Sequence, residues 1–147
     1  MHPYPHLYRA SASGEPAGAV RVASPSLPVI ETAPPPEFDG PGGLWSPESL
    51  LCAAVANCFI LTFRSVSRAA QFPWLELECR VEGTLERVEA QAQFTRYASF
   101  AKLTVPKGSD TAKARPLLER AEHSCLISNS LRGTRTLDVE VREESRE

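Results

Sequence analysis

The sequence lacks the patterns that several common classes of binding site require. It has no run of basic residues, and its formal net charge is −2 with a pI near 6.0. That balance argues against nucleic acid or an anionic membrane as the main partner. It also has no C-x-x-C pair, no glycine-rich phosphate loop and no dinucleotide fingerprint. We therefore expect neither a metal nor an organic cofactor.

The sequence also gives no sign of export or of a membrane span. The segment Met1–His6 has neither the charged start nor the apolar stretch of a secretory signal. No uncharged apolar run reaches the roughly 20 residues that a transmembrane helix needs. We therefore expect a cytoplasmic protein. In that compartment the four cysteines are more often free, catalytic or metal-bound than joined in structural disulfides.

Length predicts one domain over residues 1–147, and the residue pattern predicts that it contains both strands and helices. A hydrophobic share of 42% is enough to build a core. We expect residues 1–45 to form N-terminal strands and a Pro/Gly-rich loop, and residues 46–142 to form the core. Apolar–polar alternation predicts strands at 7–10, 19–23, 27–32, 75–82, 88–94, 101–105 and 136–141. Helices are predicted at 46–70, 110–122 and 126–131.

The predicted helix at 46–70 has a well-marked start and an apolar middle. Ser46 suits the N-cap and Pro47 the first helical position. Ser49 stands where a full capping box has Glu or Gln, so we expect that box to be incomplete. From Leu50 to Phe63 the segment is apolar on nearly every face, which predicts a buried central helix.

Cys58 lies in the middle of that helix and has two interpretations. Free cysteine is among the most buried residue types, so Cys58 can be a small core residue. Alternatively it is a nucleophile. Burial raises the pKa of a thiol, so a nucleophilic Cys58 would need a nearby cation to stabilise its thiolate.

Glu48, ten residues before Cys58, is the candidate to orient such a cation. A rise of about 1.5 Å per residue sets the two roughly 15 Å apart on one straight helix. Glu48 therefore cannot touch Cys58 of its own chain, whereas two copies of the helix packed antiparallel would bring them together. A functional Glu48 thus predicts a site shared by two chains. The alternative is a first-turn carboxylate that only stabilises the helix dipole.

The other cysteines also allow more than one role. Cys125 precedes the predicted helix at 126–131, whose free N–H groups are expected to lower its thiol pKa; it can also be a core residue. Cys52 and Cys79 are interpreted as packing residues. His123 lies two positions before Cys125, but a Cys–His hydrolase is not favoured because no companion Asn or Asp stands out.

Two segments resemble the signature segments of the OsmC/Ohr family of hydroperoxide reductases. Residues 46–59, SPESLLCAAVANCF, are similar to the family's (N/S)PE-x-L-x-A-A-x-x-x-C-F helix start. Residues 121–131, AEHSCLISNSL, are similar to its A-x-x-x-C-P-(V/I/Y)-S-x-(A/S) segment. The order of the two segments, their separation and the predicted strands between them also fit. The resemblance covers roughly residues 44–142.

This resemblance implies a thiol-dependent peroxidase that reduces organic hydroperoxides. Cys58 matches the family's attacking cysteine, which becomes a sulfenic acid, and Cys125 matches the cysteine that resolves it as a disulfide. A dithiol donor such as a lipoylated protein would then restore the pair. Glu48 matches a glutamate that holds an arginine beside the thiolate. The implied fold is an intertwined α+β homodimer with antiparallel sheets around the central helix, and Phe59 and Phe63 are expected to form an apolar substrate pocket.

The sequence departs from the family pattern at two places. Leu126 stands where the family usually has proline, which is expected to loosen the turn without removing a chemical group. The turn Ser13–Gly18 lacks the arginine that Ohr-type members carry there, so Arg21 is the favoured substitute and Arg9 the alternative. Without either cation Cys58 would be mostly thiol at neutral pH, and peroxidase activity would suffer. The alternative function is then an OsmC-like fold that binds a small apolar ligand or a partner without peroxide turnover.

Overall fold

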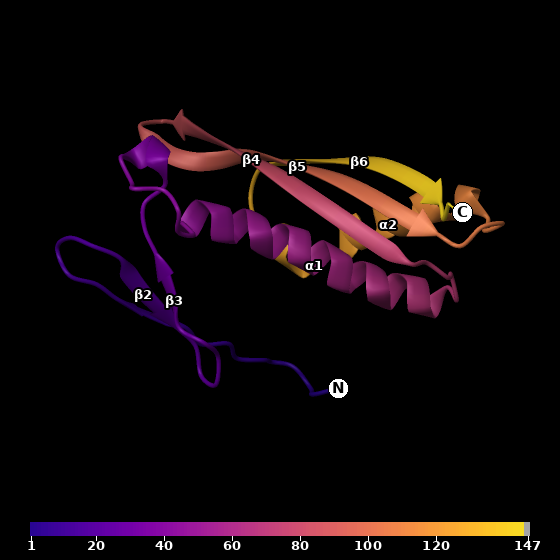
Figure 1. Ribbon diagram of the computed structural model, residues 1–147, viewed down its shortest axis with the longest axis horizontal. Coiled ribbons are helices and arrows are strands. Elements are labelled where there is room, and N and C mark those ends of the chain that lie inside the picture. The colour runs from indigo at the N-terminus through magenta and orange to yellow at the C-terminus, as the bar shows by residue number, and fades with distance from the viewer. Residues whose placement is uncertain (146–147) are drawn as a thin grey trace. The chain divides into compact units, whose positions relative to one another are not determined.

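The computed structural model describes residues 1–145, so the last two residues of the predicted 1–147 domain lie outside the described part. The chain forms two compact units, Met1–Leu50 and Leu51–Glu147. The first unit corresponds to the predicted N-terminal strands and loop together with the start of the long helix. The second unit contains the rest of that helix, a sheet and two shorter helices (Figure 1).

The N-terminal unit is built on a three-stranded antiparallel sheet. Its strands, in spatial order, are β1 (Ser11–Ser13), β2 (Val20–Ala23) and β3 (Ile30–Thr32). The strand predicted at 19–23 is confirmed, the strand predicted at 27–32 is present only over its last three residues, and the strand predicted at 7–10 is wrong. Ser13 pairs with Arg21 instead, because a hairpin pairs the residues nearest to its turn. A 3-10 helix, η1 (Pro36–Phe38), follows β3.

The long helix α1 (Pro47–Ala69) begins at the predicted residue. Ser46 Oγ accepts a hydrogen bond from the Ser49 N–H at 3.1 Å, and Ser49 Oγ accepts one from the Ser46 N–H at 2.9 Å. These two bonds are the reciprocal pair of a capping box, with serine in place of the usual glutamate. The expectation of an incomplete box is therefore wrong, because a serine hydroxyl at this position reaches the same backbone donor.

In the described chain α1 is buried along one stripe rather than on every face. The stripe recurs at four-residue intervals, as a helix packed on a sheet requires. Its residues are Val55, Phe59, Phe63 and Ser67. Leu61, on another face, is 51% exposed. By length and composition alone α1 could cross a membrane, a criterion that core helices of soluble proteins also meet.

The second unit is built on a mixed three-stranded sheet. Its strands, in spatial order, are β4 (Glu76–Val88), β5 (Gln91–Val105) and β6 (Thr134–Glu143). β4 and β5 form an antiparallel hairpin whose turn residues, Glu89 and Ala90, both have left-handed backbone angles. β6 runs parallel to β5, so the expectation of antiparallel sheets holds for the other pairs and is wrong here. A parallel pair needs a crossover connection, and helices supply it.

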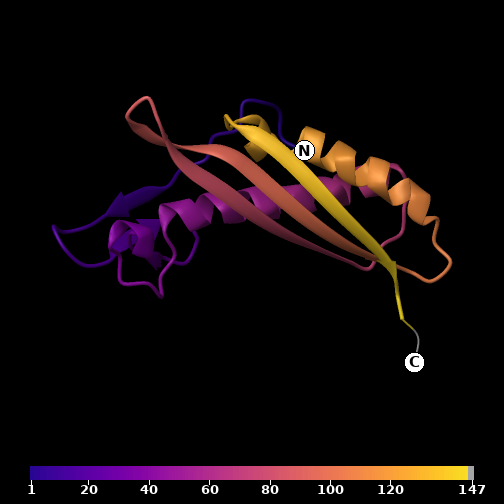
Figure 2. The same cartoon turned by 90° about the horizontal axis from the view of Figure 1, so that it is seen from above.

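That crossover contains η2 (Thr111–Lys113), α2 (Ala114–Ser124) and α3 (Leu126–Asn129). Figures 1 and 2 show α1 and α2 on the same face of the β4–β5–β6 sheet. The hydrophobic core lies between this face and the helices. Its buried residues are Phe59, Phe63, Phe72, Leu77, Ala101, Leu103, Val105, Ala114, Leu117, Leu118 and Ala121. The core therefore holds α2 beside α1, the arrangement on which the thiol site depends.

Candidate active site

Two thiols that are distant in the sequence meet in the second unit. Cys58 lies on α1, and Cys125 lies at the junction of α2 and α3. Hydrogen bonding between the two sulfurs shifts the pKa of each thiol, so the two side chains lie close together, and both cysteines are free. Cys125 is fully buried, whereas Cys58 is half-buried. Of the two, Cys58 is therefore the sulfur that a reagent from solvent can reach.

The surroundings of Cys58 favour its thiolate. Burial alone raises the pKa of this thiol, but hydrogen-bond donors outweigh that effect and bring the pKa below its ordinary value. The donors, in decreasing order of effect, are the Ile127 N–H, the Cys125 thiol, the Thr62 hydroxyl and the Leu126 N–H. None of these groups carries a formal charge. The sequence predicts that a cation is needed to lower this pKa. In the structure, neutral hydrogen-bond donors lower it without one.

The backbone explains why these donors are available. Cys125 is the N-cap of α3 and has an extended backbone. The first N–H groups of a helix have no partner within it, so those of Leu126 and Ile127 are free to bond the Cys58 sulfur. Thr62 lies one turn after Cys58 on α1. Its hydroxyl has one proton, which it donates to the Cys58 carbonyl at 2.7 Å; turned toward the sulfur, 3.8 Å away, the same proton would bond the thiolate.

Cys125 has the opposite tendency. Burial raises the pKa of its thiol, bonds with Ser128 lower it, and the adjacent Cys58 sulfur raises it again through hydrogen bonding and charge. The net pKa lies above the ordinary value. A helix N–H group, that of Ser128, does lower the pKa of Cys125 as expected, but burial outweighs it, and the first two N–H groups of α3 act on Cys58 instead. The pair consists of one thiol disposed to ionise and one disposed to keep its proton.

The remaining two thiols are less acidic than a free cysteine. Burial, followed by the charges of Glu122 and Cys125, raises the pKa of Cys79 to about 12. Burial also raises the pKa of Cys52, although the Gly83 N–H bonds to its sulfur and lowers it in part. Both surroundings agree with the predicted packing roles.

The predicted cation and its orienting carboxylate lie in the N-terminal unit. Arg21, on β2, and Arg9, before β1, are both exposed. Glu48 lies in the first turn of α1, and its Oε1 atom is buried without a hydrogen-bond partner among residues 1–145. α1 is continuous over the ten residues that separate Glu48 from Cys58, so the condition behind the predicted two-chain site holds.

The two predicted pocket residues are core residues in this chain. Phe59 and Phe63 are both fully buried, and the Phe63 ring packs edge-on against Trp74 at 5.3 Å between centroids. Their part in a substrate pocket stays a prediction, and it requires surface that neither side chain presents in the single chain.

The sequence analysis missed the groups that set the acidity of Cys58. Thr62 could have been identified from the sequence, because a residue four positions after a helical cysteine lies on the same face of the helix. The Leu126 N–H could also have been identified, because leucine, unlike the proline usual in the family, has a backbone N–H. The Ile127 N–H had no signal in the sequence, because only the packing of α3 against α1 directs it to the sulfur.

Comparison with known proteins places the chain in a family. A family model for OsmC-like proteins matches residues 40–140. The chain is 28% identical over 105 residues to peroxiredoxin OsmC of Escherichia coli, a match that covers 71% of this chain and 72% of that protein. It is 27% identical over 110 residues to the uncharacterized protein YmaD of Bacillus subtilis, with 73% of each protein covered.

Solved structures agree with this assignment. An organic hydroperoxide resistance protein OsmC from Legionella pneumophila is 26% identical with a TM-score of 0.72, and the match covers 97% of this chain and 100% of that one. An OsmC-like protein of unknown function from Vibrio cholerae has a TM-score of 0.84 at 14% identity, covering 92% and 100%. The α+β OsmC-like fold is therefore confirmed. With most of its length matched by the family model, the chain belongs to the OsmC-like protein family.

Proposed function

We propose that this chain is a cytoplasmic, thiol-dependent peroxidase that reduces organic hydroperoxides. The observation that carries the proposal is the contact between an accessible Cys58 of lowered pKa and a buried Cys125 of raised pKa. A nucleophile must be ionised to attack, and a resolving thiol must be adjacent. The relatives support the same chemistry, since they include a peroxiredoxin and an organic hydroperoxide resistance protein.

The reaction consumes two thiols and one hydroperoxide and yields a disulfide, an alcohol and water. The Cys58 thiolate attacks the terminal peroxide oxygen, the O–O bond breaks, and the departing alkoxide takes up a proton to become an alcohol. Cys58 is thereby oxidised by two electrons to a sulfenic acid. The Cys125 sulfur then attacks the Cys58 sulfur, and the sulfenic oxygen leaves as water with the proton of the Cys125 thiol. The product is a Cys58–Cys125 disulfide.

A dithiol reductant, such as a lipoylated protein, restores the thiols by exchange. Thiol–disulfide exchange requires access to the sulfur that is attacked. Cys125 is fully buried and Cys58 is not. The reductant therefore attacks Cys58, and Cys125 leaves as the first free thiol.

The predicted homodimer accounts for Glu48. A buried carboxylate oxygen without a hydrogen-bond partner is costly, and Glu48 Oε1 is such an atom within the described chain. A second copy packed antiparallel along α1 would bring this carboxylate near the Cys58 of the other copy. There Glu48 orients an arginine, Arg21 or else Arg9, beside the thiolate, and this cation adds to the effect of the neutral donors.

The second candidate function is an OsmC-like fold that binds a small apolar ligand or a partner without turnover. The observation that favours it is the turn Ser13–Gly18, which lacks the arginine found there in Ohr-type members.

Stopped-flow kinetics with thiol counting separates the two functions. The peroxidase is expected to consume cumene hydroperoxide faster than hydrogen peroxide, with loss of two thiols per chain. Cys58→Ser should abolish the reaction, and the matched control Cys52→Ser should not. If all four thiols survive an excess of either peroxide, the peroxidase is ruled out and the binding function remains.

A further inference from the structure

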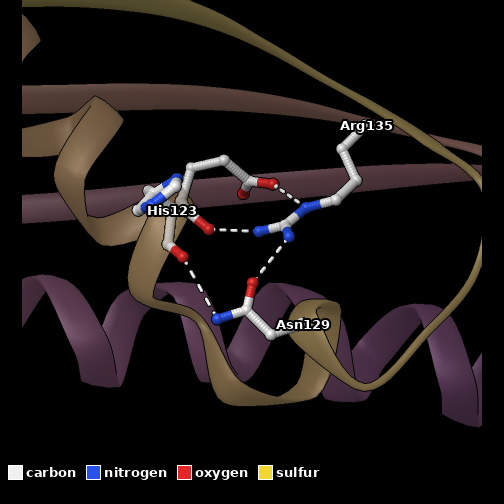
Figure 3. A network of polar contacts seen from close by, with 4 residues as sticks. His123, Asn129 and Arg135 are labelled. Carbon is white, nitrogen blue, oxygen red and sulfur yellow. Dashed lines mark hydrogen bonds and ion pairs between the residues drawn. The ribbon is translucent and has the colours of Figure 1, made fainter.

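Arg135 is the centre of a polar network that no part of the proposed reaction uses (Figure 3). It is the second residue of β6. Its Nε donates to Glu122 Oε1 at 2.8 Å, and one terminal nitrogen donates to Asn129 Oδ1 at 2.7 Å. The other terminal nitrogen donates to the Glu122 backbone carbonyl. The Asn129 amide donates in turn to the His123 carbonyl at 3.1 Å.

These contacts enclose the backbone of Cys125. Glu122 lies in the last turn of α2, and Asn129 is the last residue of α3. The Cys125 N–H donates to the Glu122 carbonyl at 3.4 Å, and the Cys125 carbonyl accepts from the Asn129 N–H at 2.9 Å. Both peptide groups of Cys125 therefore bond to residues that Arg135 holds. The planar fork of arginine can bridge three acceptors in fixed geometry.

The burial of the network distinguishes it from an ordinary surface ion pair. The side chains of Arg135 and Glu122 are 26% and 15% exposed. The other ion pair on α2, Arg115 with Glu119, is 58% and 60% exposed at 4.0 Å. Glu122 Oε2 is also buried without a hydrogen-bond partner among the described residues. A partly buried ion pair is weak evidence for a gain in folding stability. The more direct effect of this network is to fix the geometry of the residues that it joins.

We propose that Arg135 is a positioning residue that clamps the α2–α3 junction, keeping Cys125 against Cys58 and the Leu126 and Ile127 N–H groups directed at the Cys58 sulfur. Parallel pairing of β6 with β5 places Arg135 opposite Tyr97, on the side of the sheet that carries the helices. The benefit to peroxide reduction rests on the proposed function. The effect of Arg135 on the geometry of the thiol pair does not rest on the proposed function. The test therefore measures the thiol pair in the absence of peroxide.

The test measures how readily Cys58 and Cys125 form a disulfide in glutathione buffers, without peroxide. Wild type, Arg135→Met, Arg135→Lys and the matched control Arg115→Met are equilibrated, and the Cys58–Cys125 disulfide is quantified by peptide mapping. Loss of the arginine fork is expected to lower the disulfide equilibrium constant by about tenfold, the scale of a hydrogen bond to a charged group. Lysine keeps the charge but not the fork, so it should not rescue. Arg115→Met should stay close to wild type.

A second variant covers the case in which Arg135→Met does not fold. Asn129→Ala removes one arm of the network at an exposed residue and leaves the Arg135–Glu122 pair in place, so it should fold and still lower the constant severalfold. The alkylation rate of Cys58 against pH is the second readout, and its midpoint should move to higher pH in each folded clamp variant. Folded variants with lower Tm but unchanged constants and profiles would overturn the clamp. A shifted equilibrium in a protein that reduces no peroxide would uphold the clamp and refute the peroxidase.

Discussion

At the residue scale, the acidity of Cys58 depends on donors without formal charge. Two are backbone N–H groups of α3, and two are the side chains of Thr62 and Cys125. Such donors stabilise a thiolate at short range in a partly buried site, where their dipoles are less screened than in water. The Leu126 N–H exists only because residue 126 is not proline. The departure from the family pattern therefore adds a donor to the site.

Replacing Leu126 tests this donor directly. Leu126→Pro removes the N–H, while proline is tolerated at the first position of a helix. The pKa of Cys58 is expected to rise, and alkylation of Cys58 at pH 7 should slow by about two- to fivefold. Leu126→Ala keeps the N–H and serves as the control. Equal alkylation profiles in the proline and alanine variants would show that the Leu126 N–H does not act on the sulfur.

The thiol of Cys79 predicts how stability responds to alkaline pH. Its pKa is raised to about 12 in the folded chain, against about 8.5 in an unfolded one. Between those values the unfolded chain loses a proton that the folded chain keeps, so stability falls as pH rises. Urea unfolding at a series of pH values from about 9 to 11 should therefore show a shallower decline for Cys79→Ala than for wild type.

Two other thiols affect the same experiment. Cys52 and Cys125 also have raised pKa values, so they leave a residual decline in the variant. Cys58 has a lowered pKa, so it increases stability as pH rises toward the pKa of the unfolded thiol. Above that pH its contribution stays constant. Parallel pH curves for wild type and Cys79→Ala would contradict the assigned shift.

At the element scale, the sequence predicts the elements whose signals are local. The start of α1 follows from Ser46 and Pro47, and the first strand of the second unit follows from the alternation at 75–82. The parallel direction of β6 could not be predicted, because it depends on which edge of the β4–β5 hairpin the chain reaches after α2 and α3. Strand pairing across a long connection has no local signal in the sequence.

Gly83 shows how closely β4 approaches α1. A Cβ atom at this position would lie 2.9 Å from Cys52 Sγ and equally close to the Phe94 ring. Gly83→Ala is expected to destabilise the protein by about 1–3 kcal/mol through overpacking. In the Cys52→Ala background the cost should be smaller, because the sulfur is gone while the ring remains. Chemical denaturation of the four proteins measures the coupling, and strictly additive effects would show that the sulfur does not limit this approach.

At the scale of the whole molecule, α1 leaves apolar surface uncovered in the described chain. Leu61, one turn from Cys58, is 51% exposed, and Glu48 Oε1 is buried without a partner. Exposed apolar side chains on a long apolar helix are typical of a surface that another chain covers. These features support the proposed homodimer.

Sedimentation should detect that dimer and its dependence on α1. Wild type is expected to sediment with twice the mass of the chain, and Leu61→Glu should weaken the dimer at least tenfold by placing a charge in an apolar interface. Leu75 is equally exposed at 51% but lies outside α1, so Leu75→Glu should leave the dimer intact. Equal behaviour of the two variants would argue against an interface on this face of α1.

In the candidate site, too, only the features that depend on local sequence could be predicted. Cys58 and Cys125 could be found because each lies in a motif, and their pairing follows from the family resemblance. The difference in acidity between them could not be predicted, since it depends on how α3 packs on α1. The pairing of Arg135 with Glu122 could not be predicted from the sequence, because only the folded structure brings the two side chains together and partly buries them.

In the proposed reaction Cys58 is oxidised first and Cys125 resolves it. The most direct measurement treats the reduced protein with one equivalent of cumene hydroperoxide, alkylates the remaining thiols and maps the disulfide by mass spectrometry. We expect a Cys58–Cys125 disulfide with Cys52 and Cys79 alkylated, and a sulfenic acid trapped on Cys58 in Cys125→Ser. A disulfide that includes Cys52 or Cys79, or four alkylated thiols after treatment, would contradict the proposed reaction.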